Sequence, residues 1–280
     1  MQDLFAHDFK DISKNIKKRA LITFVLLIKL GGSVITRKKE NEYVIERDIL
    51  KRLAYEIKES GKRAIVVHGA GPFGHRKVTE LLLKNQNEKN KIVEIQQSTR
   101  ILNTEVLKIF NDAELNPISF PPYSLFKFSS GKPVTKNFDF LNCYFKEGFT
   151  PVVYGDICFD PENEYHICSG DESMFELAKF FRPKRAIFVA DVDGIFDRNP
   201  ENEKAKLLNQ VSNDSKISFR NERVDVTGGM EGKFKTMIKI SKFCEVWIIN
   251  GKVKHRLLKT INGKRVRGTE IFYEEKGRTR

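Results

Sequence analysis

Short apolar runs alternate with helical patterns along most of this 280-residue chain. A run from Ile22 to Lys29 precedes a helical pattern from Glu46 to Glu59, and the same succession recurs toward the C-terminus. Parallel strands need long crossover connections, usually helices, so this alternation predicts an α/β fold with a mainly parallel central sheet. The expected strands are 22–29, 64–67, 117–119, 151–154, 186–190 and 245–249, and the expected helices are 46–59, 79–83, 92–111, 173–181 and 232–242.

Several of the apolar runs end in glycine-containing turns. Lys29 is followed closely by two glycines, and a later run leads into a glycine-rich loop that ends at His75. Bare backbone N–H groups after a strand can face a phosphate, and a histidine can donate a hydrogen bond to it. None of the turns has the spacing of a Walker A loop. Phosphoryl transfer depends mostly on cations and N–H groups placed around the phosphate, so Lys29, Lys233 and the acid Asp171 predict a phosphoryl-transfer site.

Charge and cysteine content exclude several other classes of protein. The net charge is +13, but the basic residues are scattered and lack the aromatic interleaving of RNA-binding proteins, so we expect no nucleic-acid partner. The four cysteines form neither a C-x-x-C pair nor a zinc-binding pattern, so we expect no metal site, and the reducing cytoplasm is the simplest compartment. The apolar stretch 20–28 is too short to span a bilayer, so we expect no membrane partner.

The glycine-bearing segments occur in the order KLGGSVIT, VVHGAGPFGH, PVVYGD, SGD, ADVDGIF and DVTGGMEGK. This series resembles the amino acid kinase superfamily over about residues 26–272, and the loop ending in Phe-Gly-His is similar to its isopentenyl phosphate kinase branch. The resemblance implies a three-layer αβα sandwich, with an N-terminal extension at 1–20, a phosphoryl-acceptor lobe at 21–181 and a nucleotide-binding lobe at 182–280. It also implies a homodimer that uses ATP, with Mg²⁺ carried by the nucleotide.

The same resemblance implies roles for individual residues. Lys29 and Lys233 would neutralise the transferred phosphoryl group, and Asp171 would orient both lysines. The acceptor phosphate would lie on the backbone of the glycine loops, beside His75. The expected acceptor-binding residues are Gly69, Ala70, Gly74, His75 and Gly155, and the expected nucleotide-binding residues are Lys29, Gly31, Gly32, Ser33, Asp191, Gly194, Gly229 and Lys233.

Other interpretations of some of these residues stay open. Lys38 lies in a charged loop, where it is either a solvated side chain or, as the branch implies, a ligand of the transferred phosphate. His75 could simply cap or pack, but near neutral pH an imidazole can also hydrogen-bond a phosphate. Asp191 and Asp193 match acids on the nucleotide side of the family site, although a D-x-D-G turn is ordinary loop chemistry. His68, at a strand end, is expected to be structural.

The combined prediction is a kinase that converts isopentenyl phosphate to isopentenyl diphosphate. The attacking phosphate is already an anion near neutrality, so no general base is needed. Two rivals remain: a fosfomycin-type kinase of the same fold, and a non-catalytic nucleotide-sensing protein. Two departures from the family pattern are Ala70, in place of a glycine, and Pro72, which has no N–H to offer a phosphate. The expected wall of the isoprenoid pocket is the helix 92–110, with Val93, Ile101, Leu102 and Val106.

Overall fold

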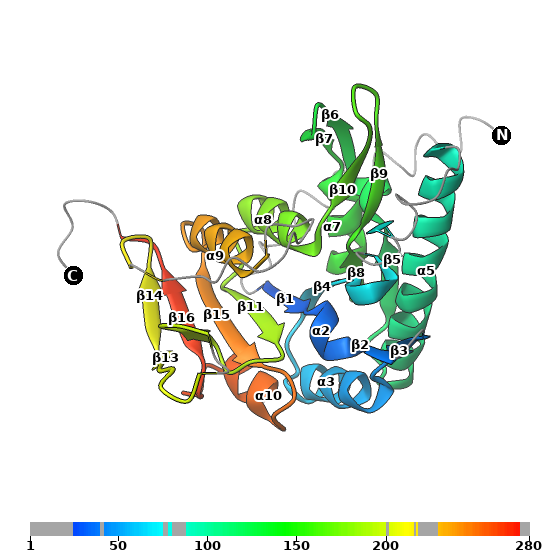
Figure 1. Cartoon of the computed structure of the whole chain (residues 1–280). Coiled ribbons are helices and arrows are strands. Elements are labelled where there is room, and N and C mark those ends of the chain that lie inside the picture. Colours follow the sequence, from blue (N-terminus) through cyan, green and yellow to red (C-terminus); the bar gives the residue numbers. More distant parts are fainter. Residues whose placement is uncertain are drawn as a thin grey trace.

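One eight-stranded sheet runs through the middle of the molecule (Figure 1). The structure is a computed structural model, and its described residues are 25–39, 42–74, 78–79, 88–199, 202–215, 217 and 229–274. From one edge to the other, the strands are β14 (Gln210–Ser212), β16 (Thr269–Phe272), β15 (Glu245–Asn250), β11 (Arg185–Ala190), β1 (Leu26–Leu30), β4 (Ala64–His68), β8 (Thr150–Tyr154) and β5 (Pro117–Phe120).

The strand directions confirm the predicted mainly parallel sheet. β1 pairs in parallel with β11 on one side and β4 on the other, so Lys29 lies between Phe188 and Val67 near the carboxyl ends of three neighbouring strands. β15 continues this direction beside β11, whereas β16 is antiparallel to β15. In open α/β sheets, ligands bind outside the carboxyl ends of the strands. The strand order therefore places Lys29 at the edge where a ligand is expected.

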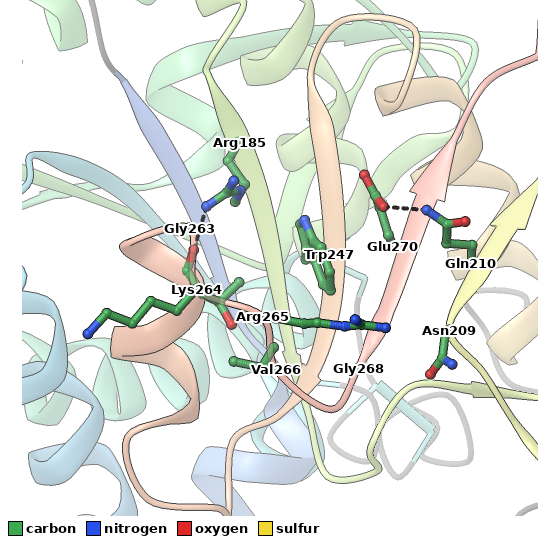
Figure 2. A pocket seen from close by; sticks show the side chains of 11 residues that line it. Arg185, Asn209, Gln210, Trp247, Gly263, Lys264, Arg265, Val266, Gly268 and Glu270 are labelled. Atoms are coloured by element: carbon green, nitrogen blue, oxygen red, sulfur yellow. Dashed lines mark hydrogen bonds between the residues drawn. The ribbon is translucent and has the colours of Figure 1, made fainter. Parts of the chain in front are cut away.

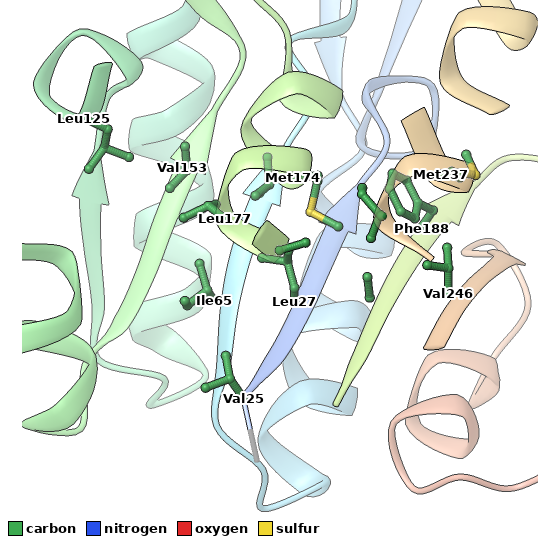
Figure 3. Packing of buried hydrophobic residues seen from close by; sticks show 14 of the residues in the cluster. Val25, Leu27, Ile65, Leu125, Val153, Met174, Leu177, Phe188, Met237 and Val246 are labelled. Carbon is green, nitrogen blue, oxygen red and sulfur yellow. The ribbon is translucent and has the colours of Figure 1, made fainter. Parts of the chain in front are cut away.

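Two layers of helices cover the sheet and complete the predicted three-layer αβα sandwich. On one face, α7 (Phe138–Lys146), α8 (Gly170–Phe181) and α9 (Gly229–Ile240) pack over strand residues such as Leu27, Ile65 and Phe188 (Figure 3). On the other face, α3 (Arg47–Glu59), α5 (Glu88–Asp112) and α10 (Arg256–Ile261) pack over Ile28 and Val66. Successive strand residues point to opposite faces, so adjacent apolar residues in one strand serve both layers.

Several shorter elements lie outside the three layers of the sandwich. Two hairpins, β6–β7 (Phe126–Ser129 and Lys132–Lys136) and β9–β10 (Asp156–Asp160 and Glu164–Cys168), project beyond the sheet beside α8 (Figure 1). Their tips are joined because Asp160 accepts hydrogen bonds from the N–H groups of Ser130 and Gly131. The remaining elements are α2 (Gly32–Ile35), β2 (Thr36–Lys39), β3 (Glu42–Ile45), the 3-10 helix η1 (Gly71–Phe73), α6 (Pro122–Leu125), β12 (Ile195–Phe196) and β13 (Leu207–Leu208).

The expected helices and strands recur, with shifted ends. α8 begins at Gly170 rather than 173 because the side chain of Ser169 accepts a hydrogen bond from the N–H of Glu172 and caps the helix. The expected helix 79–83 and the N-terminal extension 1–20 lie largely or wholly outside the described residues. Within the described residues, no helix is both long and apolar enough to cross a membrane. The sheet is continuous across residue 181, and the division into lobes stays a prediction.

Candidate active site

The glycine turns after β1 and β4 pack against each other, backbone to backbone. A Cβ atom added to Gly32 would lie 2.5 Å from the nitrogen of Gly71, and one added to Gly69 would lie 2.6 Å from the nitrogen of Gly32. No side chain fits at that separation, so these positions require glycine for close approach. The two turns that the sequence predicted to bind phosphate are therefore neighbours in space.

A buried ion pair lies beside these turns. The Nζ atom of Lys29 is 2.5 Å from the Oδ1 atom of Asp171, and both side chains are about nine-tenths buried. Asp171 is the second residue of α8, and Gly170 leaves room for the lysine, since a Cβ atom there would lie 3.3 Å from Cε of Lys29. Burial lowers the pKa of Lys29; Asp171 opposes this shift, and the charge of Lys233 adds to it. The predicted Lys29–Asp171 contact is thus present.

Lys233 belongs to the same electrostatic cluster. It is the fifth residue of α9, just past the first turn, and its charge lowers the pKa of Lys29. No described residue forms an ion pair with Lys233. Two cations with one buried carboxylate leave an excess of positive charge that an anionic ligand would neutralise.

The two acids of the D-x-D-G turn have different surroundings. Ser33, after β1, donates a hydrogen bond from Oγ to Oδ1 of Asp191 at 3.0 Å, so these nucleotide-side residues are brought together. Asp193 instead forms ion pairs with Arg256 at 2.5 Å and Arg267 at 2.7 Å. Desolvation would raise the pKa of Asp193, but the hydrogen bonds from both arginines outweigh it and lower the pKa. Asp193 thus joins its own loop to the start of α10 and to the loop before β16.

Gly194 and Gly229 differ in what they require. A Cβ atom on Gly194 would lie 2.4 Å from Oγ1 of Thr269, so this glycine is needed for packing against β16. Gly229 begins α9 with φ +59°, and no atom of the described residues lies within 4 Å of a Cβ atom added to it. The packing of Gly194 gives a structural reason for its identity that is independent of a nucleotide.

Some backbone N–H groups of the loops that were predicted to bind phosphate already donate hydrogen bonds within the protein. The N–H of Gly69 donates to Leu30 O at 2.8 Å, and that of Gly155 donates to His68 O at 3.1 Å, because both extend the ladder of the sheet. These two N–H groups are therefore engaged within the sheet, and the roles of Gly69 and Gly155 in binding the acceptor phosphate stay predictions. The N–H groups of Ala70 and Gly170 have no acceptor among the described residues.

The available N–H groups also lie near one another. A Cβ atom added to Gly155 would lie 3.3 Å from the nitrogen of Gly170 and 3.9 Å from that of Ala70. The helix α8 starts at Gly170, so its dipole favours an anion at the same place. The sequence analysis missed Gly170 as a phosphate-binding candidate, although its position before Asp171 at a helix start was the available signal.

A model of the amino acid kinase family matches residues 25–250 of this chain. The chain belongs to this family. Isopentenyl phosphate kinase of Methanothermobacter thermautotrophicus is 32% identical over 88% of the chain and 98% of that protein, and the enzyme of Thermoplasma acidophilum is 33% identical over 83% and 94%. A solved isopentenyl phosphate kinase superposes with a TM-score of 0.78 at 30% identity, covering 88% of this kinase and 99% of that chain.

Two polar side chains behind the acceptor loops of this amino acid kinase are buried. His68 stacks on Tyr154 and places Nε2 3.2 Å from Oδ1 of Asn103, and burial lowers its pKa to about 4, so the ring is neutral, in line with a structural role. Asp156 accepts hydrogen bonds at Oδ1 from Thr99 and from the N–H of Ile157, both at 2.8 Å. Its Oδ2 is buried without a hydrogen-bond partner among the described residues, and Asp156 was not among the site residues predicted from the sequence.

Two predicted site residues of the kinase cannot be placed. His75 lies outside the described residues, as does the side chain of Lys38, whose backbone is in β2. Gly74 is described and buried, and a Cβ atom there would lie 2.6 Å from Cβ of Ala70. The roles proposed for His75 and Lys38 therefore stay predictions.

The predicted isoprenoid wall on α5 is not formed as expected. Leu102 and Val106 are fully buried in the core beneath the sheet, together with residues of α3, so they cannot line an open pocket. Val93 and Ile101 are 50% and 59% exposed. The helical period correctly predicted a helix over 92–111, but it did not show which of its faces is buried.

Proposed function

We propose that this amino acid kinase transfers the γ-phosphoryl group of ATP to isopentenyl phosphate and forms isopentenyl diphosphate. The observation that carries the proposal is the buried Lys29–Asp171 ion pair where the glycine turns of β1 and β4 meet. The acceptor is suggested by the relatives, which are isopentenyl phosphate kinases over most of this chain.

The reaction is a substitution at phosphorus. An oxygen of the acceptor phosphate attacks the γ-phosphorus, and the bond to the oxygen bridging the β- and γ-phosphates breaks. Lys29 and Lys233 neutralise the charge that develops on the transferred group, and Asp171 fixes the position of Lys29. The N–H groups of Ala70 and Gly170 hold the acceptor phosphate, which needs no separate base.

A magnesium ion bound to the nucleotide would neutralise charge on its phosphates. The described part of the chain has no group of three or more side chains suited to hold a metal on its own, which fits an ion bound mainly by phosphate oxygens. Asp171 is paired with Lys29 and Asp193 with two arginines, whereas Asp191 forms no ion pair with a described residue. Asp191 is therefore the carboxylate that we assign to this ion.

An apolar cluster beside the acceptor loop is suited to the isoprenoid tail. Ile157 follows Gly155 and Asp156 directly and packs with Val78 and Ile95. Side chains from both α5 and the β9–β10 hairpin extend this cluster. The partly buried members are Ile92, Tyr165 and Ile167.

A coupled ADP-release assay tests the function. The parent should give higher kcat/KM with isopentenyl and dimethylallyl phosphate than with fosfomycin, because each buried methylene contributes about 0.8 kcal/mol. Ile157→Ala should shift the preference toward geranyl phosphate, whereas Ile101→Ala, in an exposed position, should not. A parent that prefers fosfomycin would overturn the acceptor; an unchanged preference in Ile157→Ala would overturn only the tail site.

We also propose that the kinase acts as a homodimer, as the family resemblance implies, and that it acts in the cytoplasm, as expected from its cysteine content. Sedimentation equilibrium measures the mass of the assembly directly. A species of 32.4 kDa at working concentration would contradict the dimer.

A further inference from the structure

A hollow of about 540 Å³, lined by none of the candidate active-site residues, lies on the sheet at the edge formed by β15, β16 and β14 (Figure 2). The helix α10 has only six residues and packs over β15 and β11. The hollow lies next to this helix, where the helix no longer covers the sheet. Ile271 and Val211 turn inward to the opposite core, so the outer face of the last two strands carries polar side chains. Among the described residues no helix covers this face.

The floor of the hollow combines an aromatic ring with a polar pair. Trp247 of β15 is opposite Glu270 of β16, which is opposite Gln210 of β14, so the three side chains form a row across the sheet. The side-chain N–H of Gln210 donates to Oε2 of Glu270 at 2.8 Å. This pair still offers carboxylate and amide oxygens as acceptors to a ligand that carries N–H or O–H groups.

The rim is cationic. Arg185 is already engaged, because its Nε is 2.7 Å from Oε2 of Glu245 and its Nη1 donates to the carbonyl of Thr260. Lys264 and Arg265, in the loop after α10, line the same hollow, are exposed, and form no ion pair with any described residue. The Arg265 side chain extends toward the strands, whereas that of Lys264 points away from Trp247 (Figure 2). The uncommitted guanidinium of Arg265 can attract an anionic group, and the charge of Lys264 on the same loop adds to this attraction.

We propose that this hollow binds a nucleotide at a second site, separate from the candidate active site. The base would stack on Trp247, its donor groups and the ribose hydroxyls would meet Glu270 and Gln210, and the phosphate would meet the guanidinium of Arg265, with Lys264 adding positive charge from the same loop. The volume is within the range of about 300–1,000 Å³ usual for small-ligand sites. An inorganic anion would leave the ring unused, and an apolar ligand would leave the cations unused.

The chain offers a direct reporter, since Trp247 is its only tryptophan. Tryptophan fluorescence of the full-length protein should therefore be measured during titration with AMP, with adenosine and with inorganic phosphate. AMP should quench the signal to saturation, whereas adenosine and phosphate, each lacking half of the ligand, should bind at least about tenfold more weakly. Equilibrium dialysis with labelled ADP should find two sites per chain.

A charge-reversed variant separates the hollow from the active site. Lys264→Glu combined with Arg265→Glu should weaken AMP quenching by about tenfold or more and reduce labelled ADP to one site per chain, with kinase activity retained. The control Lys108→Glu, on the exposed side of α5, should change neither. The proposal would be overturned if AMP did not quench the fluorescence, if the double reversal did not weaken the quenching, or if the parent bound ADP at a single site. These outcomes do not depend on which acceptor the kinase phosphorylates.

Discussion

Replacing Asp156 with Asn should remove a pH-dependent loss of stability. Burial raises the pKa of Asp156 from 3.8 to about 6, and the hydrogen bonds from Ile157 and Thr99 only partly oppose it. Between these two pKa values the folded protein binds more protons than the unfolded chain, so its stability falls as the pH rises from about 4 to 6. A difference of about 2 in pKa corresponds to about 3 kcal/mol.

Urea unfolding followed by circular dichroism, at pH values from 4 to 7.5, measures this effect. Asn at position 156 keeps an oxygen for Thr99 and for the N–H of Ile157 but does not titrate. The stability of Asp156→Asn minus that of the parent should therefore increase by about 3 kcal/mol across this range. A difference in stability that stays constant with pH, or decreases, would refute the conclusion that burial raises the pKa of Asp156.

Asp160 provides a control of opposite sign. Although desolvation opposes the shift, hydrogen bonds from the N–H groups of Gly131 and Glu162 lower the pKa of Asp160 to about 2. Its contribution to stability is present above the ordinary carboxyl pKa and is lost as the pH falls toward 2. Asp160→Asn should therefore be most destabilised near neutral pH, and its stability should approach that of the parent in acid.

Three further predictions concern the site. Lys29→Ala and Lys233→Ala should each lower kcat by on the order of 10²-fold in the ADP-release assay with circular dichroism unchanged, and near-parental turnover would remove that lysine from the mechanism. His75→Ala should raise the acceptor KM about tenfold or more while the KM for ATP stays near normal, and equal effects on both would contradict its assignment to the acceptor. Asp193→Asn should lower the melting temperature with little change in acceptor KM, because Asp193 joins loops through Arg256 and Arg267; unchanged melting would contradict this.

The sequence predicted the sheet and the meeting of its turns because both depend on local patterns. β1 and β4 are apolar runs with a glycine turn after them, and parallel strands bring such turns to one edge. Asp171 follows β10, which lies in a separate hairpin, so its assignment to the site of Lys29, 142 residues away, came from the resemblance to the family. The hydrogen bonds of individual N–H groups, such as that of Gly69, depend on the register of the strands. The pattern of glycines in the sequence does not predict this register.

The hairpins and the faces of the long helix were not predicted for a different reason. β6 and β7 contain exposed Lys127 and a register shift next to Phe128, so their alternation is short and irregular. In α5, apolar residues occur on more than one side, and only contacts with distant segments decide that Leu102 is core and Ile101 is exposed. The hollow beside Trp247 likewise depends on where α10 ends relative to β14, which comes from an earlier part of the chain.

The continuity of the sheet limits how this kinase can close around its substrates. β1 is hydrogen-bonded along its whole length to β11 on one side and β4 on the other. A hinge placed between β1 and either neighbour would break these ladders, so we expect any closing motion to preserve the pairing of β1. The β6–β7 and β9–β10 hairpins lie outside the sheet, and because Asp160 joins their tips, we expect them to move together.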